Sequence, residues 1–486
     1  MNRSLLAATF AAALLTGCSV GPKYNPPQVA TAPTWKTEGP WRQAAPKDAL
    51  PKGAWWEVFQ DAQLNDYEQQ LLKANPSLVA AKDRLDQARA LARVATAGYF
   101  PQVSADPGAL RERLAANRPS AAAPFHSLSQ NVFTIPFALN YEPDLFGRVR
   151  KNVEAANASL QANAADLQNV QLVLSAELAA DYFSLRELDA EYKVVQRSVD
   201  EQKKALDYVQ NRHVGGVASG LEVAQQATVL DSTVAQLSLV QQQREQFEHA
   251  IAVLTGNQPS TFSVPVEPLH VTPPPVPLGV PSDVLERRPD IAEAERNMAF
   301  ANAQVGIAKT AFYPQLTISG GTGLQSTSLS SLATSPNIVW SLGADLLQPI
   351  VNGGRNRANL AATQAAYNQS VDNYRQTVLT AFQQVEDGLT GLNTLSEASK
   401  SQEAAVEDAR KALEIATNRY QGGLDPYLNV ITAETTLLAN ERLETQLLGQ
   451  QMVTSVALVK ALGGGWNAAE IKSEQVHPQP GQILQQ

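Results

Sequence analysis

The amino-acid sequence predicts a mainly α-helical fold with a small amount of β structure, built from two copies of one unit. Three observations support this prediction. Segments far apart in the chain repeat each other, each half carries an apolar stripe of helical period that is too long for a globular domain, and each half contains short stretches in which apolar and polar residues alternate as in strands. A chain of 486 residues is long enough for such a duplication.

Two pairs of segments carry the duplication. QARALARVATAGYFPQV at 87–103 is echoed by NAQVGIAKTAFYPQL at 302–316, with an offset of 213 residues. NRHVGGVASGLEV at 211–223 is echoed by NRYQGGLDPYLNV at 418–430, with an offset of 207 residues. The second copy has therefore lost six residues between these segments. We place the loss in the loop of a hairpin, because a change in loop length costs little free energy.

The first elements of each copy are expected to be a helix and a strand hairpin. The helices are predicted from about Pro76 to Gly98 and from about Pro289 to Ala311, with proline in the first turn, where its missing amide hydrogen costs no hydrogen bond. The hairpins are predicted at about 99–143 and 312–348. Their alternating apolar residues are Phe133, Ile135, Phe137, Leu139 and Tyr141 in the first copy and Ile338, Trp340, Leu342, Ala344 and Leu346 in the second.

A much longer helix follows each hairpin. In the first copy, apolar residues recur at steps of three and four from Val149 to Leu188, and the pattern continues to Arg212. A helix of about 65 residues is roughly 95 Å long at 1.5 Å per residue. The stripe is narrow and rich in alanine, which suggests close helix neighbours as in a coiled coil. The second copy repeats the stripe through Val378 and Leu392. We therefore expect rods and not a compact core.

Both rods are predicted to end at a glycine pair, because glycine adopts the left-handed conformation that ends a helix. The pairs are Gly215-Gly216 and Gly422-Gly423. A return helix is expected directly after each pair. Ser219 and Glu222 match a capping box, and in the second copy Asp425 is expected to cap a helix that has Pro426 at its first position.

Cys18 is the only cysteine of the chain, so it forms no internal disulfide and cannot by itself make a zinc or iron–sulfur site. It follows Arg3 and an apolar run from Leu5 to Leu15, which is the layout of an export signal and is too short to span a bilayer. LTGC at 15–18 also resembles the lipobox of bacterial lipoproteins. The resemblance implies cleavage before Cys18 and covalent N-acyl and S-diacylglycerol lipid on it, and several acyl chains anchor a protein stably.

The residue after the cysteine, Ser19, is not the aspartate that retains many lipoproteins at the inner membrane, so the outer membrane is the expected location. The alternative is an ordinary signal peptide with a chance cysteine. The expected organisation is a lipoprotein signal peptide at 1–17, a lipid-anchored Pro-rich tether at 18–54, a first repeat at 55–259, a Pro-rich connector at 260–282, a second repeat at 283–466 and a C-terminal tail at 467–486.

Composition argues against several classes of protein. A net charge of -9 with 17% charged residues gives little support to a nucleic-acid partner. The mature chain has no run of 18 apolar residues, so a bilayer crossing would have to use strands closed into a barrel. One hairpin per copy gives four strands per chain, whereas the smallest membrane barrels need about eight. Several chains would therefore have to share one barrel.

We expect no enzyme activity, no metal site and no cofactor other than the lipid. The five histidines have no metal-ligand spacing; they are His126, His213, His249, His270 and His477. GGTG at 320–323 lacks the pattern of a phosphate-binding loop and falls in a predicted strand, where plain strand glycine explains it.

Four motifs carry a resemblance to a known family. WWEVFQDAQLN at 55–65, YEPDLFGRVR at 141–150, PSDVLERRPDIAEAE at 281–295 and ALGGGW at 461–466 resemble the outer-membrane efflux lipoproteins of the TolC/OprM class, in the NodT-type branch. The resemblance implies a TolC-like fold: a homotrimer whose four strands per chain complete a 12-stranded outer-membrane β-barrel, continuous with a long periplasmic α-helical barrel.

The resemblance also implies function and partners. Such a protein is a passive exit duct for drugs and other small molecules, gated at its periplasmic tip. It docks to a periplasmic adaptor (membrane fusion) protein and an inner-membrane transporter of the resistance-nodulation-division (RND) type, which supplies the energy. Two alternatives stay open: the duct of a type I protein secretion system, and a lipid-anchored coiled-coil scaffold without a pore.

The resemblance places the periplasmic gate at Leu428, Asn429 and Thr432. Relatives often have aspartate at the last two positions, and a ring of carboxylates would attract cations, whereas Asn and Thr close a pore by size and hydrogen bonds. We expect Leu428 to form the constriction, with interhelical packing as the alternative role. The expected adaptor contacts are the turns at Arg212, Gly215, Gly216, Arg419, Gly422 and Gly423; the alternative is that these glycines only end the helices.

Overall fold

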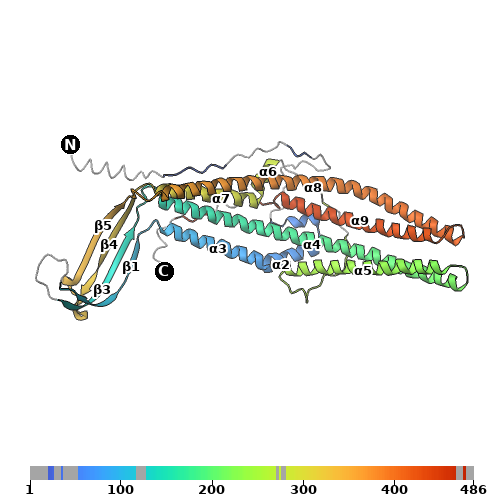
Figure 1. Ribbon diagram of the computed structural model, residues 1–486, viewed down its shortest axis with the longest axis horizontal. Helices are drawn as coiled ribbons and strands as arrows, with labels where there is room; N and C mark the ends of the chain where they lie inside the picture. Colours follow the sequence, from blue (N-terminus) through green and yellow to red (C-terminus); the bar gives the residue numbers. More distant parts are fainter. Residues whose placement is uncertain are drawn as a thin grey trace.

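The computed structural model of the chain describes residues 20–26, 34–36, 53–116, 127–269, 273–274, 281–466 and 474–477. Cys18 and the export signal lie outside these residues, as do His126 and His270. The chain is elongated, with a β-sheet at one end and long helices that run from it to the other end (Figure 1). Among the described residues, no helix combines the length and apolar character needed to cross a membrane.

The two halves contain the same series of helices. The first half has α3 (Pro76–Ala97), α4 (Arg148–Val214) and α5 (Gly220–Leu254); the second has α7 (Pro289–Thr310), α8 (Arg355–Gln421) and α9 (Leu428–Ala461). Shorter elements precede them, namely the 3-10 helix η1 (Trp55–Phe59), α2 (Ala62–Ala74) and α6 (Pro281–Arg287). Both α4 and α8 have 67 residues, or roughly 100 Å. The predicted rods and the helices that start at proline are confirmed.

All strands pair antiparallel in one sheet. They are β1 (Gln102–Ala105), β2 (Gly108–Leu114), β3 (Leu128–Tyr141), β4 (Gln315–Ser326) and β5 (Ile338–Leu347), in the order β1-β3-β4-β5. β2 also pairs with β3, so β1 and β2 share one position in the sheet and are separated at Asp106 and Pro107. Proline there has no amide hydrogen to donate to the ladder. The glycines at 320–323 lie in β4, as predicted.

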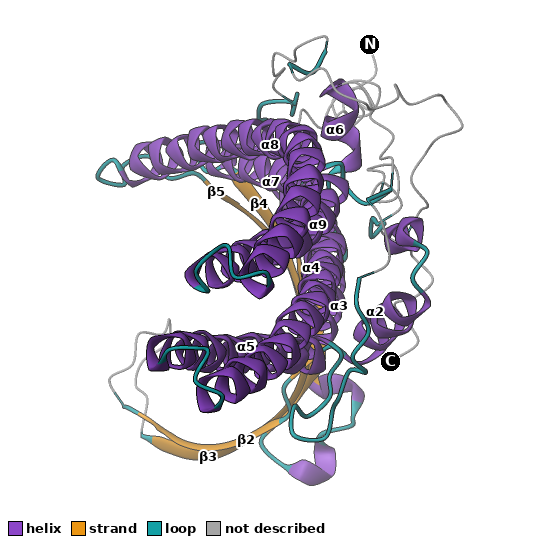
Figure 2. Ribbon diagram, turned by 90° about the vertical axis from the view of Figure 1, so that its right-hand side faces the viewer, coloured by secondary structure: helices purple, strands orange, loops and turns teal. Residues whose placement is uncertain are grey.

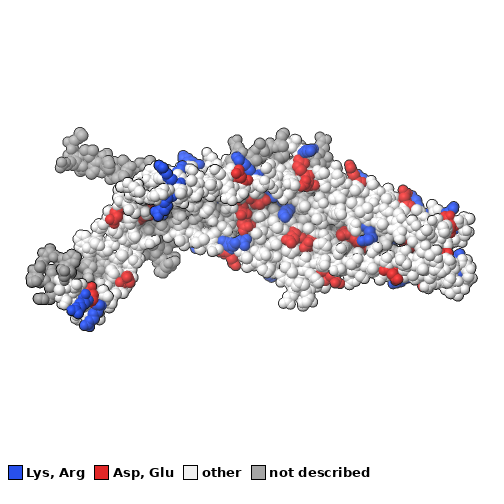
Figure 3. Space-filling model, viewed as in Figure 1, with Lys and Arg blue, Asp and Glu red and all other residues white. Residues whose placement is uncertain are grey.

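The two halves lie side by side. β3 of the first half pairs with β4 of the second, from Phe133 opposite Ser326 to Tyr141 opposite Ile318, and α4 packs along α7. Viewed along the rods, the long helices and the strands follow one arc, with α2 and α6 on its convex side (Figure 2). The concave side is the one seen in Figures 1 and 3.

The main apolar core lies at the equator, which we define as the middle of the rods, where η1 and α2 pack against α4 and where α8 and α9 meet. Its fully buried members include Phe59, Phe183, Val385 and Met452. The apolar stripe of α4 supplies much of this core, and Phe59 and Phe183 are in ring contact at 4.9 Å. Between the sheet and the equator α4 buries five alanines, in line with the alanine-rich stripe, whereas toward the turns it buries Val195, Val199 and Val209.

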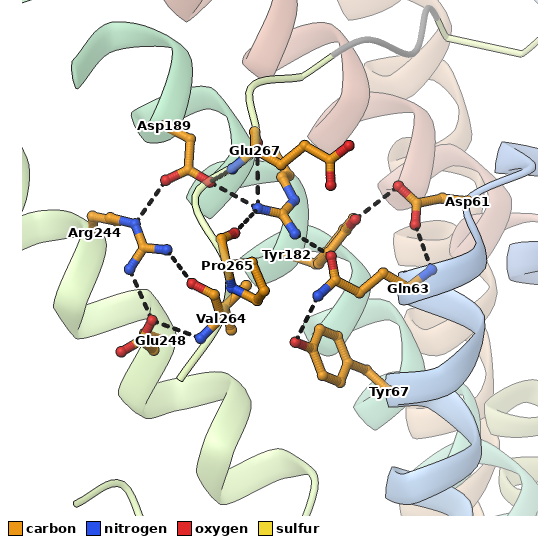
Figure 4. Close-up of polar contacts among 11 residues, drawn as sticks. Asp61, Gln63, Tyr67, Tyr182, Asp189, Arg244, Glu248, Val264, Pro265 and Glu267 are labelled. Atoms are coloured by element: carbon orange, nitrogen blue, oxygen red, sulfur yellow. Dashed lines mark hydrogen bonds and ion pairs between the residues drawn. The ribbon is translucent and has the colours of Figure 1, made fainter. Parts of the chain in front are cut away.

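A buried ionic cluster, which we call the equatorial clamp, holds the start of the Pro-rich connector (Figure 4). Asp189 of α4 is fully buried and lies 2.8 Å from Arg186 and 2.7 Å from Arg244 of α5. Arg244 donates to Val264 O at 2.6 Å, and Asp189 accepts from Glu267 N at 3.0 Å. Each of the two arginines also donates to a further acceptor, Arg186 to Pro265 O and Arg244 to Glu248. The connector is thus fixed to the rods at this point.

The capping predictions had mixed outcomes. The capping box is confirmed: Ser219 Oγ accepts from Glu222 N, and Ser219 N donates to Glu222 Oε1, both at 3.3 Å. The predicted cap at Asp425 is wrong. Its carboxylate accepts from Arg419 Nε at 2.6 Å, and α9 begins two residues beyond Pro426, at Leu428. A charged guanidinium is a stronger hydrogen-bond donor to a carboxylate than a neutral backbone amide.

Candidate functional site

The turns that join α4 to α5 and α8 to α9 lie side by side at the end of the molecule farthest from the sheet (Figure 1). The two turns have the same hydrogen bonds. Val217 N donates to Arg212 O and Leu424 N donates to Arg419 O, both at 2.9 Å, which closes each helix in a Schellman motif. The structure therefore brings all six predicted contact residues of the turns to the end of the molecule that is farthest from the sheet.

Only the second glycine of each pair is left-handed. Gly216 has φ +75° and Gly423 has φ +71°, whereas Gly215 and Gly422 have φ near -75° and end their helices in ordinary conformations. The expectation of left-handed backbone is thus right for the second residue and wrong for the first. A Cβ at Gly216 or Gly423 would meet no atom within 4 Å. Gly216 and Gly423 are therefore favoured by their left-handed backbone and not by crowding, since both face open space.

Side chains of the two hairpins meet behind the turns in a group that we call the tip latch. It consists of Tyr420 and Tyr427 from the second hairpin and Glu222 and Gln226 from α5. Tyr420 OH donates to Glu222 Oε2 at 2.7 Å, and Tyr427 OH donates to Gln226 Oε1 at 2.8 Å. The tyrosine rings lie 4.8 Å apart and are buried. The latch is a direct polar link between the two hairpins.

The protonation states of Tyr420 and Glu222 favour the hydrogen bond between them. Burial and the hydrogen bond to Glu222 raise the pKa of Tyr420 to about 12, so it remains a donor. Burial opposes ionisation of Glu222, but hydrogen bonds from Tyr420 and Ser219 outweigh it and lower the pKa of Glu222. At neutral pH a phenol therefore donates to a carboxylate. The Arg212 guanidinium lies 5.1 Å from the centre of the Tyr420 ring, a cation–π contact between the hairpins.

The predicted gate residues lie on the first turns of α9, next to the latch. Leu428, Asn429 and Thr432 are all exposed, and Leu428 is 52% exposed. Packing within this chain therefore does not account for Leu428. The Thr432 hydroxyl donates to Leu428 O at 2.8 Å, so its own helix satisfies it. Among the turn residues, Arg212 is half-buried against Tyr208 and Tyr420, and Arg419 pairs with Asp425.

The latch residues were missed from the sequence, with the exception of Glu222, which was assigned only to a helix cap. A signal was present. With the 207-residue offset, Tyr420 and Tyr427 correspond to His213 and Gly220, so the second copy has two tyrosines beside its turn where the first copy has none. Such a difference between otherwise similar segments indicates a contact that only one copy makes.

The sheet, at the opposite end of the molecule, has an apolar surface. The exposed side chains of β5 include Trp340 and Leu342 at 79% and 74% exposure, and the sheet shows few charges along its length (Figure 3). Acidic and basic side chains are spread along the helices instead. An exposed apolar band on strands is typical of a lipid-facing surface. Among the described residues, no group of three or more metal-ligating side chains could hold a metal ion.

Comparisons with known proteins cover almost the whole chain. Residues 68–257 and 280–464 match the model of the outer membrane efflux protein family. The pyoverdine export outer membrane protein OpmQ of Pseudomonas aeruginosa is 32% identical over 472 residues, which are 96% of this chain and 97% of OpmQ. The toluene efflux pump outer membrane protein TtgC of Pseudomonas putida is 32% identical over 96% of both chains.

Solved structures agree with these relatives. The outer-membrane channel OprN superposes with a TM-score of 0.86 at 29% identity, over 92% of this chain and 100% of OprN. The outer membrane protein VceC from Vibrio cholerae superposes with a TM-score of 0.79 at 32% identity, over 85% of this chain and 99% of VceC.

Proposed function

The chain belongs to the outer membrane efflux protein family, and from this premise we propose that it is the gated exit duct of a tripartite pump. It is an outer-membrane efflux protein whose helices extend into the periplasm, as in its relatives and structural neighbours. The observation that most supports a duct is that a sheet with two unpaired edges is continuous with two rods of equal length. A single copy leaves this structure open.

We propose that three copies close it, so that four strand positions per chain complete 12. The duplication supports this. Inside the chain, the first repeat presents α4 and β3 to α7 and β4 of the second repeat. The equivalent elements of the second repeat are α8 and β5. They pack on α7, α9 and β4, but no third repeat follows them in the described chain, and the elements at the other edge are α3, β1 and β2. A neighbouring copy would fill that position.

Exposed apolar side chains mark both free edges. Val94 of α3 is 70% exposed, and Ile350 and Val351 before α8 are 92% and 89% exposed. At the equivalent join inside the chain, Phe146 stacks on Tyr313 with ring centres 5.1 Å apart. With the offsets of 207 and 213 residues, Phe146 and Tyr313 correspond to Gly353 and Phe100. Val351, two residues before Gly353, would therefore lie near Phe100 of the next copy. Burial of these side chains between copies would remove the apolar surface from water.

A crosslink between copies tests the trimer. With Phe100→Cys and Val351→Cys in one chain, a short bifunctional maleimide should yield covalent trimers on denaturing gels. The pair Phe100→Cys and Leu424→Cys is the matched control, because Leu424 is 70% exposed but lies at the distant turn. Monomers only, or a ladder that continues beyond three chains, would contradict the proposed closure.

We place the gate at Leu428, Asn429 and Thr432, which three copies would bring around one axis. Their exposure on the first turns of α9, beside the latch, supports this position. None of the three side chains is ionisable, so closure would depend on the size of Leu428 and on hydrogen bonds and would select weakly by charge. The turns at Arg212, Gly215, Gly216, Arg419, Gly422 and Gly423 are the proposed adaptor contacts.

Bulky substitutions at the turns test docking. Gly216→Val and Gly423→Val force a β-branched residue into left-handed backbone, which strains the turn, although no atom lies within 4 Å of the added Cβ. We expect normal trimers in the membrane and a large fall in drug resistance. Gly53→Val is the matched control, since Gly53 also has φ +85° and open space but lies at the equator. Normal export by both turn variants would refute the docking assignment.

The proposed partners are a periplasmic adaptor protein and an inner-membrane RND transporter, which supplies the energy. The proposed cargo is small molecules, because the relatives are named for export of pyoverdine, toluene and antibiotics. This favours small-molecule efflux over a type I protein secretion duct. A scaffold without a pore is disfavoured, because the structural neighbours are channels.

We also propose the lipid anchor on Cys18, which lies outside the described residues. Two observations support it. Val20 N donates to Phe146 O at 3.1 Å, so the chain two residues after Cys18 lies where the sheet meets the helices. Two described residues farther along contact the helices: Tyr24 OH donates to Glu295 O of α7 at 3.1 Å, and Trp35 contacts Phe382 of α8 with ring centres 6.2 Å apart. An acyl chain on Cys18 would reach the membrane.

A further inference from the structure

Between the equator and the turns, the two hairpins contact each other mainly through α4 and α9, and we call this contact the hairpin seam. Two carboxyl side chains of α4 face α9 there. Glu187 and Glu191 are four residues apart, so they lie on one face of the helix. Glu191 is 3% exposed. Glu187 lies against Gly449 of α9, where a Cβ would overlap its Cγ. The missing side chain of Gly449 thus makes room for Glu187.

The groups that face this pair supply one positive charge. Arg442 of α9 donates from Nε to Glu191 Oε1 at 2.7 Å, and Gln446 donates to Glu191 Oε2 at 3.2 Å. Arg442 also donates to Gln236 of α5 at 3.3 Å. These bonds occupy Glu191. The neighbouring acid of α9, Glu441, already pairs with Arg197 and Arg410, so those two arginines do not serve Glu187.

Glu187 is the unusual member of the group. Its Oε1 is buried and has no hydrogen-bond partner among the described residues, and its side chain lies on the same face of α4 as that of Glu191. A hydrogen bond between two carboxyl groups requires a proton on one of them. Burial, together with the charge of Glu191, raises the pKa of Glu187 to about 8. Both carboxyls and Arg442 then form a neutral group at pH 7.

We propose that Glu187 and Glu191 of α4 share one proton at the hairpin seam and that loss of this proton loosens α9 from α4, which makes the seam a pH-sensitive control of opening. The proposal rests on the proposed duct, because a duct closed at its turns opens when its hairpins move apart. It adds a control point in the middle of the rods, remote from the tip latch.

The sign of the pH effect follows from proton linkage. In a parted seam Glu187 meets water, and its pKa returns toward the ordinary glutamate value of 4.5. The closed seam therefore binds the proton more tightly, and opening releases it. Raising the pH from the ordinary glutamate range to about 8 favours opening, by at most about tenfold per pH unit. Glu222 of the latch has the opposite dependence, but its window lies below the ordinary glutamate value because its pKa is lowered. Tyr420 has the same sign as Glu187, but its window lies above the ordinary tyrosine value of 10, so neither group titrates near pH 7.

Conductance of the full-length trimer in planar bilayers, from about pH 6 to about pH 8.5, tests the proposal. The wild-type leak should rise several-fold with pH. Glu187→Gln keeps a neutral donor of the same shape and should give a low leak that does not change with pH. Glu191→Gln leaves Arg442 to pair with Glu187, which lowers the pKa of Glu187 and should move the transition to more acidic pH. Glu245→Gln, on the exposed face of α5, should behave as wild type.

Infrared spectroscopy of the same trimers gives a readout that needs no current. In the difference spectrum of wild type minus Glu187→Gln, a protonated carboxyl band should be present at neutral pH and decrease near pH 8. The difference removes the bands of other buried acids whose pKa is also raised, such as Glu68 and Glu434. If the trimers conduct but the profiles of wild type and Glu187→Gln coincide, or if the band is missing, the shared proton is refuted. If no trimer conducts at any pH, the proposed duct fails, and the infrared band still decides whether the proton is present.

Discussion

Tyr420→Phe is expected to make the closed duct leak, with an open probability about tenfold above that of the wild type. The substitution removes the hydroxyl that donates to Glu222 and keeps the ring on Tyr427 and under Arg212. Hydrogen bonds to charged groups contribute about 1.5–3 kcal/mol. Glu222 is partly solvated and regains water when the bond is lost, so we use the lower limit, which corresponds to roughly tenfold.

Single-channel recording measures this effect, and sensitivity of cells to antibiotics too large for the intact outer membrane reports it in vivo. Tyr192→Phe is the matched control, because Tyr192 lies on α4 and its hydroxyl has no hydrogen bond within the described chain. Glu222→Gln should have a smaller effect than Tyr420→Phe, because the amide oxygen still accepts from the Tyr420 hydroxyl. Combined with Tyr420→Phe it should add little, since the donor is already absent. A wild-type leak in Tyr420→Phe would show that the latch does not hold the closed state.

Asp189→Asn is expected to destabilise the folded protein by about 3–5 kcal/mol, because it removes the carboxylate between Arg186 and Arg244 and leaves two buried guanidinium groups without their shared counter-ion. The clamp also holds the backbone of the connector through Val264 and Glu267. We therefore expect a lower temperature of trimer dissociation and faster proteolysis in the connector, both measurable on purified protein.

Asp200→Asn on the same helix is the control. Asp200 is exposed and lies 3.8 Å from Lys203, and exposed pairs of this kind contribute about 0–1 kcal/mol. Its trimers should melt like the wild type. Equal melting temperatures for Asp189→Asn and Asp200→Asn would mean that the clamp adds nothing to stability and that the connector is held by its other contacts.

Much of the fold could be predicted because each helix and strand shows the periodicity of its own secondary structure. Steps of three and four residues identify α4 and α8, steps of two identify the strands, and the glycine pairs mark the ends of the rods. Because of the duplication, each long helix is predicted twice, once in each half of the sequence. The predictions that were wrong concern side chains with two possible partners, because periodicity does not show which partner binds more strongly. Asp425, for example, was expected to cap a helix and instead pairs with Arg419.

The position of the two turns could be predicted from the sequence, but the contacts between the hairpins could not, and the roles of the gate and adaptor-contact residues stay predictions. The glycine pairs locate the turns, yet the link between the hairpins joins Tyr420 to Glu222, which are 198 residues apart, and no periodicity reports such a pair. The connector shows the same limit. Its prolines predict an extended segment, but its attachment depends on the buried charges of Asp189 and Arg244, which in a helical pattern look like ordinary surface residues.

The equal length of α4 and α8 makes the protein a molecular ruler. Two uninterrupted helices of 67 residues fix how far the two turns stand from the sheet, and a helix changes that reach only in increments of about 1.5 Å with a rotation of about 100° each. An insertion in one rod would tilt the two turns relative to each other and twist its buried face outward. If the turns dock to an adaptor as proposed, the reach of the rods can change only by matched insertions in both halves, in near-whole numbers of heptads.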